Sequence, residues 1–155
     1  RRKTAKLFEA AARLGAVLGD AAPAQEDALA RYGMHLGIAF QIQDDVLDYE
    51  GDAVTLGKNL GDDLAEGKMT LPLIRALATA SAADAAYVRA TLANGESADF
   101  ARVHALLESS GAIAYARGRA AQEARAAAGC LADLAPSPQA TTLLQLSTFA
   151  ADRDF

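Results

Sequence analysis

Three aspartates crowd one short stretch of the sequence, the run FQIQDDVLDY at residues 40–49. On a helix, Asp44 and Asp48 lie one turn apart on the same face, with Asp45 beside them and Gln41 about one turn earlier. Two unit charges about 6 Å apart repel by roughly 3 kcal/mol at an effective dielectric of about 20. Mg²⁺ relieves such repulsion, since it prefers oxygen ligands and is usually held by carboxylates together with substrate phosphates. The cluster therefore predicts a site for a metal-bridged phosphate ligand.

The pentapeptide DDVLD alone is more typical of a solvated acidic helix face than of a metal site, and other metals also have to be considered. An EF-hand beginning at Asp48 requires glycine at its sixth position and glutamate at its twelfth, where this chain has Ala53 and Asn59. Zinc is poorly supported, because His35 and His104 lie far apart in the sequence. We interpret His35 as a packed helix residue without a partner at ligand spacing.

Basic residues close to the aspartates make the phosphate interpretation more specific, because a diphosphate needs cations as well as metal-bound carboxylates. Lys58 lies within a glycine-rich segment, residues 51–67, and Lys68 follows it directly. Lys3 and Thr4 add another ammonium and a hydroxyl on a helix that can pack beside the aspartate helix. Each lysine alone would be interpreted as a surface residue. We expect the glycine-rich segment to be a polar loop that closes over the diphosphate.

The elements that position these residues are predicted to be helices throughout, since alanine, leucine, glutamate and arginine dominate the composition. Gly33 and Gly37, one turn apart in the aspartate helix, predict close approach of another helix. Ser81 with Asp84 indicates a capping box, and Thr70 and Ser137 are expected N-caps. The predicted helices span residues 1–19, 25–49, 70–79, 81–93, 97 or 99 to 111, 112–134 and 137–151.

Composition and charge narrow the class of protein. The 155 residues, 52% of them hydrophobic, suit one domain or a large part of one. A net charge of -5 without a dense basic stripe argues against nucleic acid. The single cysteine, Cys130, predicts no internal disulfide, a small buried apolar role and a cytoplasmic setting. No apolar run approaches the about 20 residues needed to span a bilayer. The helical pattern is already running at Arg1, so we expect upstream helices to be missing.

Three ordered motifs resemble one known family, the trans-isoprenyl diphosphate synthases or polyprenyl synthetases. They are KTAKLFEAA from Lys3, GIAFQIQDDVLDYEGD from Gly37 and LGKNLGDDLAEGKMTLPLI from Leu56, in the order and spacing of the C-terminal half of that family. The resemblance implies an isoprenoid-synthase-type helical bundle, here with about seven of its helices. It also implies a Mg²⁺-dependent prenyltransferase that adds isopentenyl diphosphate to an allylic diphosphate. The long-chain, octaprenyl type is the most similar.

The same resemblance implies a role for each residue of the site. Asp44 would ligate Mg²⁺, while Asp45 and Asp48 position metal-bound water and the diphosphate. The ammonium groups expected to grip the allylic diphosphate belong to Lys3, Lys58 and Lys68. Oxygens expected near the allylic carbon, where positive charge develops, come from Thr4 and Gln41. Phe40 is expected beside the incoming isopentenyl unit.

The family uses two aspartate-rich motifs, and this sequence contains the second alone. We therefore expect residues 1–155 by themselves to bind Mg²⁺-diphosphate weakly and to turn over little. The resemblance further implies a homodimer, at most peripheral to membranes, whose product becomes a quinone side chain. A shorter-chain farnesyl or geranylgeranyl synthase and a non-catalytic regulatory or dimerising homologue remain alternatives.

Overall fold

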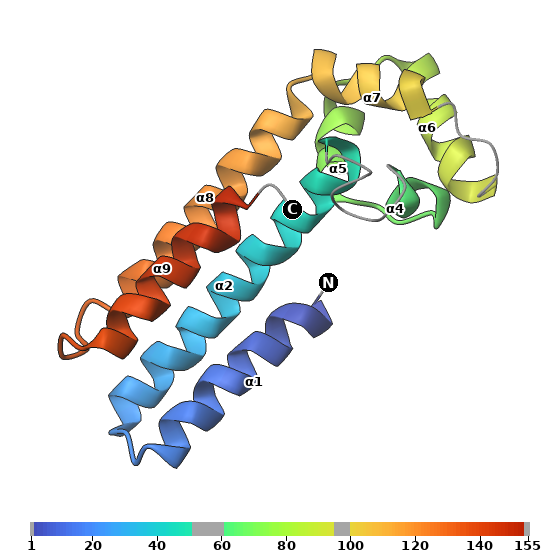
Figure 1. Cartoon of the computed structure of the whole chain (residues 1–155). Helices are drawn as coiled ribbons and strands as arrows, with labels where there is room; N and C mark the ends of the chain where they lie inside the picture. The colour runs from blue at the N-terminus through green and yellow to red at the C-terminus, as the bar shows by residue number, and fades with distance from the viewer. Residues whose placement is uncertain (1, 51–60, 95–99, 154–155) are drawn as a thin grey trace. The chain divides into compact units, whose positions relative to one another are not determined.

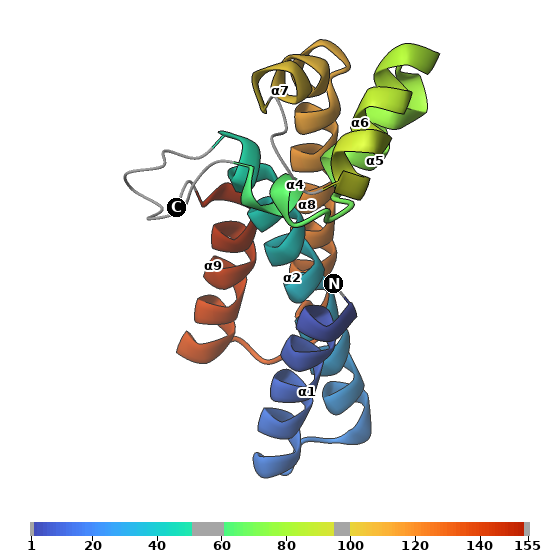
Figure 2. The same cartoon turned by 90° about the vertical axis from the view of Figure 1, so that its right-hand side faces the viewer.

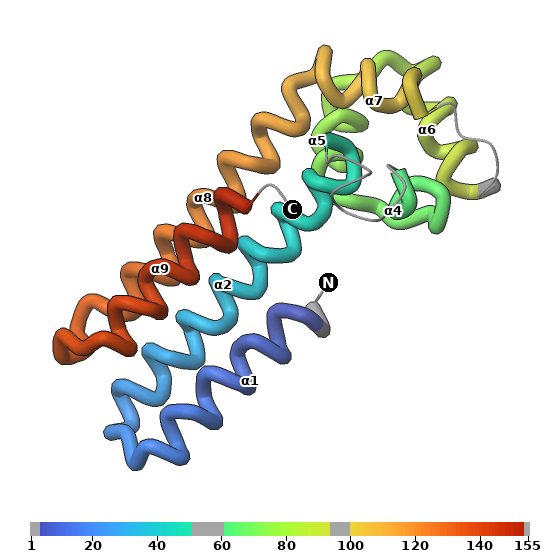
Figure 3. Tube along the Cα trace, in the orientation of Figure 1, coloured from blue at the N-terminus to red at the C-terminus, as the bar shows by residue number. Residues whose placement is uncertain are grey.

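The described part of the computed structural model, residues 2–50, 61–94 and 100–153, is helical and contains no strand (Figures 1 and 3). This confirms the predicted all-α class. None of its helices is long and apolar enough to cross a membrane. The helices are α1 (Arg2–Leu18), α2 (Pro23–Glu50), α4 (Asp62–Ala65), α5 (Leu71–Thr79), α6 (Ala82–Asn94), α7 (Phe100–Ser109), α8 (Ala112–Cys130) and α9 (Pro138–Asp152).

The chain divides into two compact units. The first contains residues up to Gln43 together with Gly118–Arg153, and the second contains Asp44–Arg117. In the first unit, α1 and α9 run along α2, with α8 beside α9 (Figures 1 and 2). Small side chains let these helices approach closely, since much of the core is alanine. The buried core residues are Tyr32, Leu36, Ala39, Ala124, Ala127, Leu131 and Ala150.

The contact between α1 and α2 depends on the two glycines singled out in the sequence. A Cβ atom at Gly33 would lie 2.4 Å from the carbonyl oxygen of Phe8. A Cβ atom at Gly37 would lie 2.8 Å from the Cα atom of Ala5. The predicted close approach of another helix is confirmed, and α1 is that helix.

The second unit contains the last turns of α2, the first turns of α8 and, among the described residues between them, the helices α4, α5, α6 and α7. α5 packs against both α6 and α7, and α4 packs against α6. Tyr49, at the end of α2, stacks on Phe100 of α7 with ring centroids 6.4 Å apart. The fully buried apolar side chains of this unit include Val46, Tyr49, Leu64, Leu73, Val88, Val103 and Leu107.

Two of the three predicted caps form as expected. The Ser81 hydroxyl accepts the Asp84 amide at 3.1 Å and donates to the Asp84 carboxylate at 2.7 Å. The Ser137 hydroxyl accepts the Ala140 amide at 3.1 Å at the start of α9. Thr70 occupies the N-cap position of α5 without a capping hydrogen bond from its side chain within the described residues.

The glycine-rich segment contains a helix that the sequence did not predict. Helix α4 begins directly after Gly61, whose φ of 82° lies in the left-handed region that favours glycine. Asp62 and Asp63 in its first turn complement the helix dipole. The loop prediction is therefore wrong at this end. Residues 51–60, with Lys58, lie outside the described residues, so closure over a ligand stays a prediction.

Three smaller expectations also need correction. Helix α8 ends at Cys130 rather than at Leu134, because hydrogen bonds such as Leu134 N–H to Leu131 C=O form tight turns before Pro136. Cys130 is half-buried, not fully buried, at the margin of the core. His35 has a partner, since its Nδ1 lies 2.7 Å from Glu123 Oε2.

Candidate functional site

The three aspartates of the DDVLD run lie on the last two turns of α2, and they differ in exposure. Asp44 and Asp48 are half-buried, whereas Asp45 is only 1% exposed. The buried Val46 and Leu47 anchor these turns in the core. The helix therefore presents two accessible carboxylates one turn apart and turns the third inward.

Asp48 holds the beginning of α4 through both its backbone and its side chain. Its carbonyl oxygen accepts the Gly61 amide at 2.8 Å, and its Oδ2 accepts the Asp63 amide at 3.2 Å. The pKa of Asp48 is raised to about 6, chiefly by burial and also by the neighbouring Asp63 and Asp62 carboxylates. The Asp63 amide opposes this rise. The carboxylates of Asp48, Asp62 and Asp63 therefore repel one another, and a hard cation with oxygen ligands would relieve this repulsion.

Asp45 faces the beginning of α5. Its Oδ2 accepts the Leu71 amide at 3.4 Å, at a helix N-terminus where a negative charge is favoured. A buried carboxylate needs such donors, because its desolvation is costly. Asp45 is therefore placed as a link between helices, and its oxygens face the protein interior.

Lys68 pairs with an acidic residue of α4 and with the residue that follows that helix. Its Nζ is 2.7 Å from Asp63 Oδ1 and 2.7 Å from Glu66 Oε2. The hydrogen bond to Asp63, and after it the hydrogen bond to Glu66, raises the pKa of Lys68 above its ordinary value. The ammonium is half-exposed, so phosphate oxygens can replace one of the two carboxylates.

The other predicted site residues fall in the first unit or outside the described side chains. Thr4 and Gln41 are half-buried, and only the backbone of Lys3 is described, as part of α1. Phe40 packs against Phe8, with centroids 5.6 Å apart. The structure thus places Asp44, Asp45, Asp48 and Lys68 in one unit and Phe40, Thr4 and Gln41 in the other.

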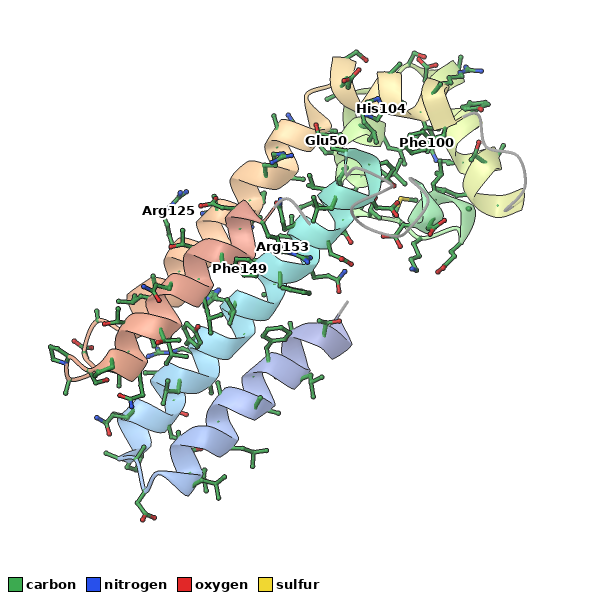
Figure 4. The ribbon with its side chains drawn as sticks, in the orientation of Figure 1. Glu50, Phe100, His104, Arg125, Phe149 and Arg153 are labelled. Atoms are coloured by element: carbon green, nitrogen blue, oxygen red, sulfur yellow. The ribbon has the colours of Figure 1, made fainter. Side chains whose placement is uncertain are left out.

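Two contributions were not predicted from the sequence. Asp63 and Glu66 hold the Lys68 ammonium, although the signal was present as acidic residues five and two positions before the lysine. The guanidinium of Arg153, which is labelled in Figure 4, lies 3.9 Å from the centroid of the Phe40 ring and donates to the Phe40 carbonyl at 3.4 Å. No pattern signals this contact, since 113 residues separate the partners.

The residues suit a magnesium ion that is bound by the protein and a ligand together better than one that is bound by protein side chains alone. Within the described residues, no group of three or more His, Cys, Asp or Glu side chains is arranged to hold a metal. Mg²⁺ does not need one, because it commonly takes one or two carboxylates, several waters and substrate phosphates. Asp44 and Asp48 would hold it here, with Lys68 nearby for a phosphate oxygen.

Known proteins are similar to this chain in both sequence and fold. Residues 1–109 match the family model described as polyprenyl synthetase. Octaprenyl diphosphate synthase from Haemophilus influenzae is 41% identical over 87 residues, 56% of this chain and 26% of that protein. A short chain isoprenyl diphosphate synthase from Methanothermobacter thermautotrophicus is 38% identical over 83 residues, 54% of this chain and 26% of that protein.

A solved structure extends the likeness over the whole chain. Polyprenyl synthase from Caulobacter crescentus, complexed with calcium and isoprenyl diphosphate, aligns with a TM-score of 0.92 at 40% identity. The alignment covers 99% of this chain and 47% of that one, so the chain spans about half the length of this relative. The resemblance inferred from the three motifs is confirmed. The chain belongs to the polyprenyl synthetase family.

Proposed function

We propose that this chain is the C-terminal part of a Mg²⁺-dependent prenyltransferase. The enzyme adds isopentenyl diphosphate units to an allylic diphosphate and makes a long-chain all-trans polyprenyl diphosphate, of octaprenyl length, for quinone side chains. The observation that carries this proposal is the arrangement at the end of α2, where the Asp48 carboxylate and the Lys68 ammonium both contact Asp63. Octaprenyl diphosphate synthase among the relatives supports the product length.

The chemistry requires that an allylic C–O bond ionise, so the leaving diphosphate must be stabilised as its charge develops. A bound Mg²⁺ supplies Lewis acidity toward the diphosphate oxygens. Lys68 would leave Asp63 or Glu66 and donate to those oxygens. Thr4 and Gln41 would direct oxygen dipoles at the allylic cation, and the Phe40 ring would exclude water beside the incoming isopentenyl unit.

Helix α1 supports the proposal that the rest of the domain completes the site. One of its faces packs on α2, while a second face presents exposed apolar side chains at i, i+7, i+10 and i+11, namely Leu7, Leu14, Val17 and Leu18. A helix that is apolar on two faces belongs inside a bundle. We propose that this face receives an apolar helix from the half of the domain that the relatives contain beyond this alignment. That half would bring the first aspartate-rich motif.

Two alternatives follow from particular observations. A shorter-chain synthase is supported by the Methanothermobacter relative, and chromatography of the product of the complete enzyme decides between the lengths. A non-catalytic homologue, acting as a regulatory or dimerising subunit, is disfavoured because Asp44, Asp48 and Lys68 are all retained. By analogy with the family, the complete enzyme would be a cytoplasmic homodimer, peripheral to membranes during product release.

Binding of inorganic diphosphate tests the proposal without requiring turnover. We expect ³¹P NMR titration of the chain to show weak binding that requires Mg²⁺, reduced at least about tenfold by Asp44→Asn, in line with the loss of one charge-assisted contact. Asp27→Asn is the matched control, because Asp27 lies on the same helix with its side chain 71% exposed. Equal affinity with and without Mg²⁺, or equal losses in both variants, would refute the proposal.

A further inference from the structure

We infer that Tyr49 and Thr70 are positioning residues for the diphosphate site and that, with Asp45, they form a buried clamp between α2 and α5. The inference rests on the proposed function. The Tyr49 hydroxyl lies 3.0 Å from the Thr70 hydroxyl, and Tyr49 is 1% and Thr70 0% exposed. Asp45 lies one turn before Tyr49 and accepts the Leu71 amide. Both links join the last turns of α2 to the first residues of α5.

Within the described residues, the Thr70 side chain does not cap its own helix. A threonine at an N-cap normally accepts an amide of its own helix two or three residues later. Thr70 turns its hydroxyl to Tyr49 instead, and the amide of Leu71 is satisfied by Asp45. Two polar contacts at the beginning of α5 are therefore made by α2, which couples the position of α5 to α2.

The Tyr49 ring is fixed from the other side as well. It stacks on Phe100 with an interplanar angle of 4°. The Phe100 ring also fills the space beside Gly61, where a Cβ atom would lie 2.5 Å from it. Gly61 in turn donates its amide to the Asp48 carbonyl. The last turns of α2 thus hold the segment 61–71 at both of its ends.

Lys68 is the residue whose position the clamp determines. Its side chain is half-exposed and its ion pairs go to Asp63 and Glu66 of the same segment. Its backbone amide also bonds within the segment, to the Asp63 carbonyl at 2.8 Å. The ammonium therefore follows the backbone of the segment, which Thr70 and Leu71 anchor to α2. Tyr49 and Thr70 are too buried to touch a ligand, so they act through Lys68.

The test compares two buried tyrosines on the same helix. Tyr49→Phe and Thr70→Val remove the clamp hydroxyls, and Thr70→Ser retains one. Tyr32→Phe is the control, because Tyr32 is also buried at 2% exposure and donates to the Leu143 carbonyl at 2.9 Å in the other unit. The readouts are Mg²⁺-dependent affinity for inorganic diphosphate, by ³¹P NMR, and amide hydrogen exchange across residues 61–71 without ligand.

We expect Tyr49→Phe and Thr70→Val to weaken diphosphate binding about fivefold, the effect of one lost hydrogen bond, and to speed exchange across the segment. Thr70→Ser, which retains a hydroxyl, should leave both the affinity and the exchange at wild-type values. Tyr32→Phe should also change neither. Equal effects of Tyr32→Phe and Tyr49→Phe, or unchanged exchange in Tyr49→Phe, would overturn the clamp. If the wild-type chain binds no diphosphate, the proposed function is refuted instead. The hydrogen-exchange data would still show whether the clamp exists.

Discussion

An alanine at Gly33 should destabilise the protein, although alanine is the better helix former. The added Cβ atom would lie 2.4 Å from the Phe8 carbonyl oxygen and 2.8 Å from its carbon. These are backbone atoms, so no change of side-chain rotamer relieves the overlap. To accept the methyl group, α1 must move away from α2 and weaken the packing of Phe8 and Ala12.

The expected magnitude follows from two opposing terms. Replacing glycine by alanine inside a helix gains about 1 kcal/mol. Overpacking a contact costs about 1–3 kcal/mol, and the upper part of that range applies because the obstacle is backbone. The net loss for Gly33→Ala is therefore about 1–2 kcal/mol, or a fall in Tm of about 2–8 °C for a protein of this size.

Gly118→Ala is the matched control, since Gly118 lies in α8 and no described atom beyond its own helix neighbourhood lies within 4 Å of its Cβ position. This variant should gain up to about 1 kcal/mol. Urea denaturation followed by circular dichroism at 222 nm measures both free energies of unfolding. The reasoning is refuted if Gly33→Ala is as stable as Gly118→Ala, because the close contact between α1 and α2 would then be absent in solution.

Three further changes test other parts of the structure. Ser137→Ala should cost about 1 kcal/mol in thermal unfolding, because the Ala140 amide loses its acceptor, and an unchanged Tm would show that the cap contributes nothing. Arg153→Ala should lower the free energy of unfolding by about 1 kcal/mol through the lost contact with the Phe40 ring, and Arg153→Lys should lower it by less. Equal free energies of unfolding for the wild type and both variants would contradict this. Leu14→Lys should leave the Tm unchanged and prevent assembly with the rest of the domain in size-exclusion chromatography, and co-elution of that variant would place the interface elsewhere.

Features with local causes were predicted well from the sequence. Ser81 and Ser137 cap helices through residues three positions away, so the pattern contains the whole interaction. Gly33 and Gly37 also predicted a close helix contact, because the packing of another helix compensates for the low helix propensity of two glycines inside a helix. The end of α8 was missed, since tight turns and an α-helix both suit the same alanine-rich composition there.

The sequence predicts a chemistry for the candidate site, which stays a prediction, and does not predict its geometry. The types and order of Asp44, Asp48 and Lys68 indicated a diphosphate site before any fold was considered. The roles of Asp45 and Tyr49 were not visible, because they depend on where α5 begins in space. Thr70 was predicted as an ordinary N-cap, and only the position of α2 explains why its hydroxyl turns away from its own helix.

Prenyl transfer by the complete domain is the most direct test of the proposed site at the end of α2. The chain, combined with the remaining half of the domain, is supplied with labelled isopentenyl diphosphate, an allylic diphosphate and Mg²⁺. We predict Mg²⁺-dependent incorporation of label into polyprenyl product that Asp44→Asn lowers by at least about a hundredfold, as expected for the loss of a charged group that stabilises the transition state, and that Asp27→Asn leaves unchanged. Equal incorporation by the wild-type protein and Asp44→Asn, or incorporation without a divalent cation, would contradict it.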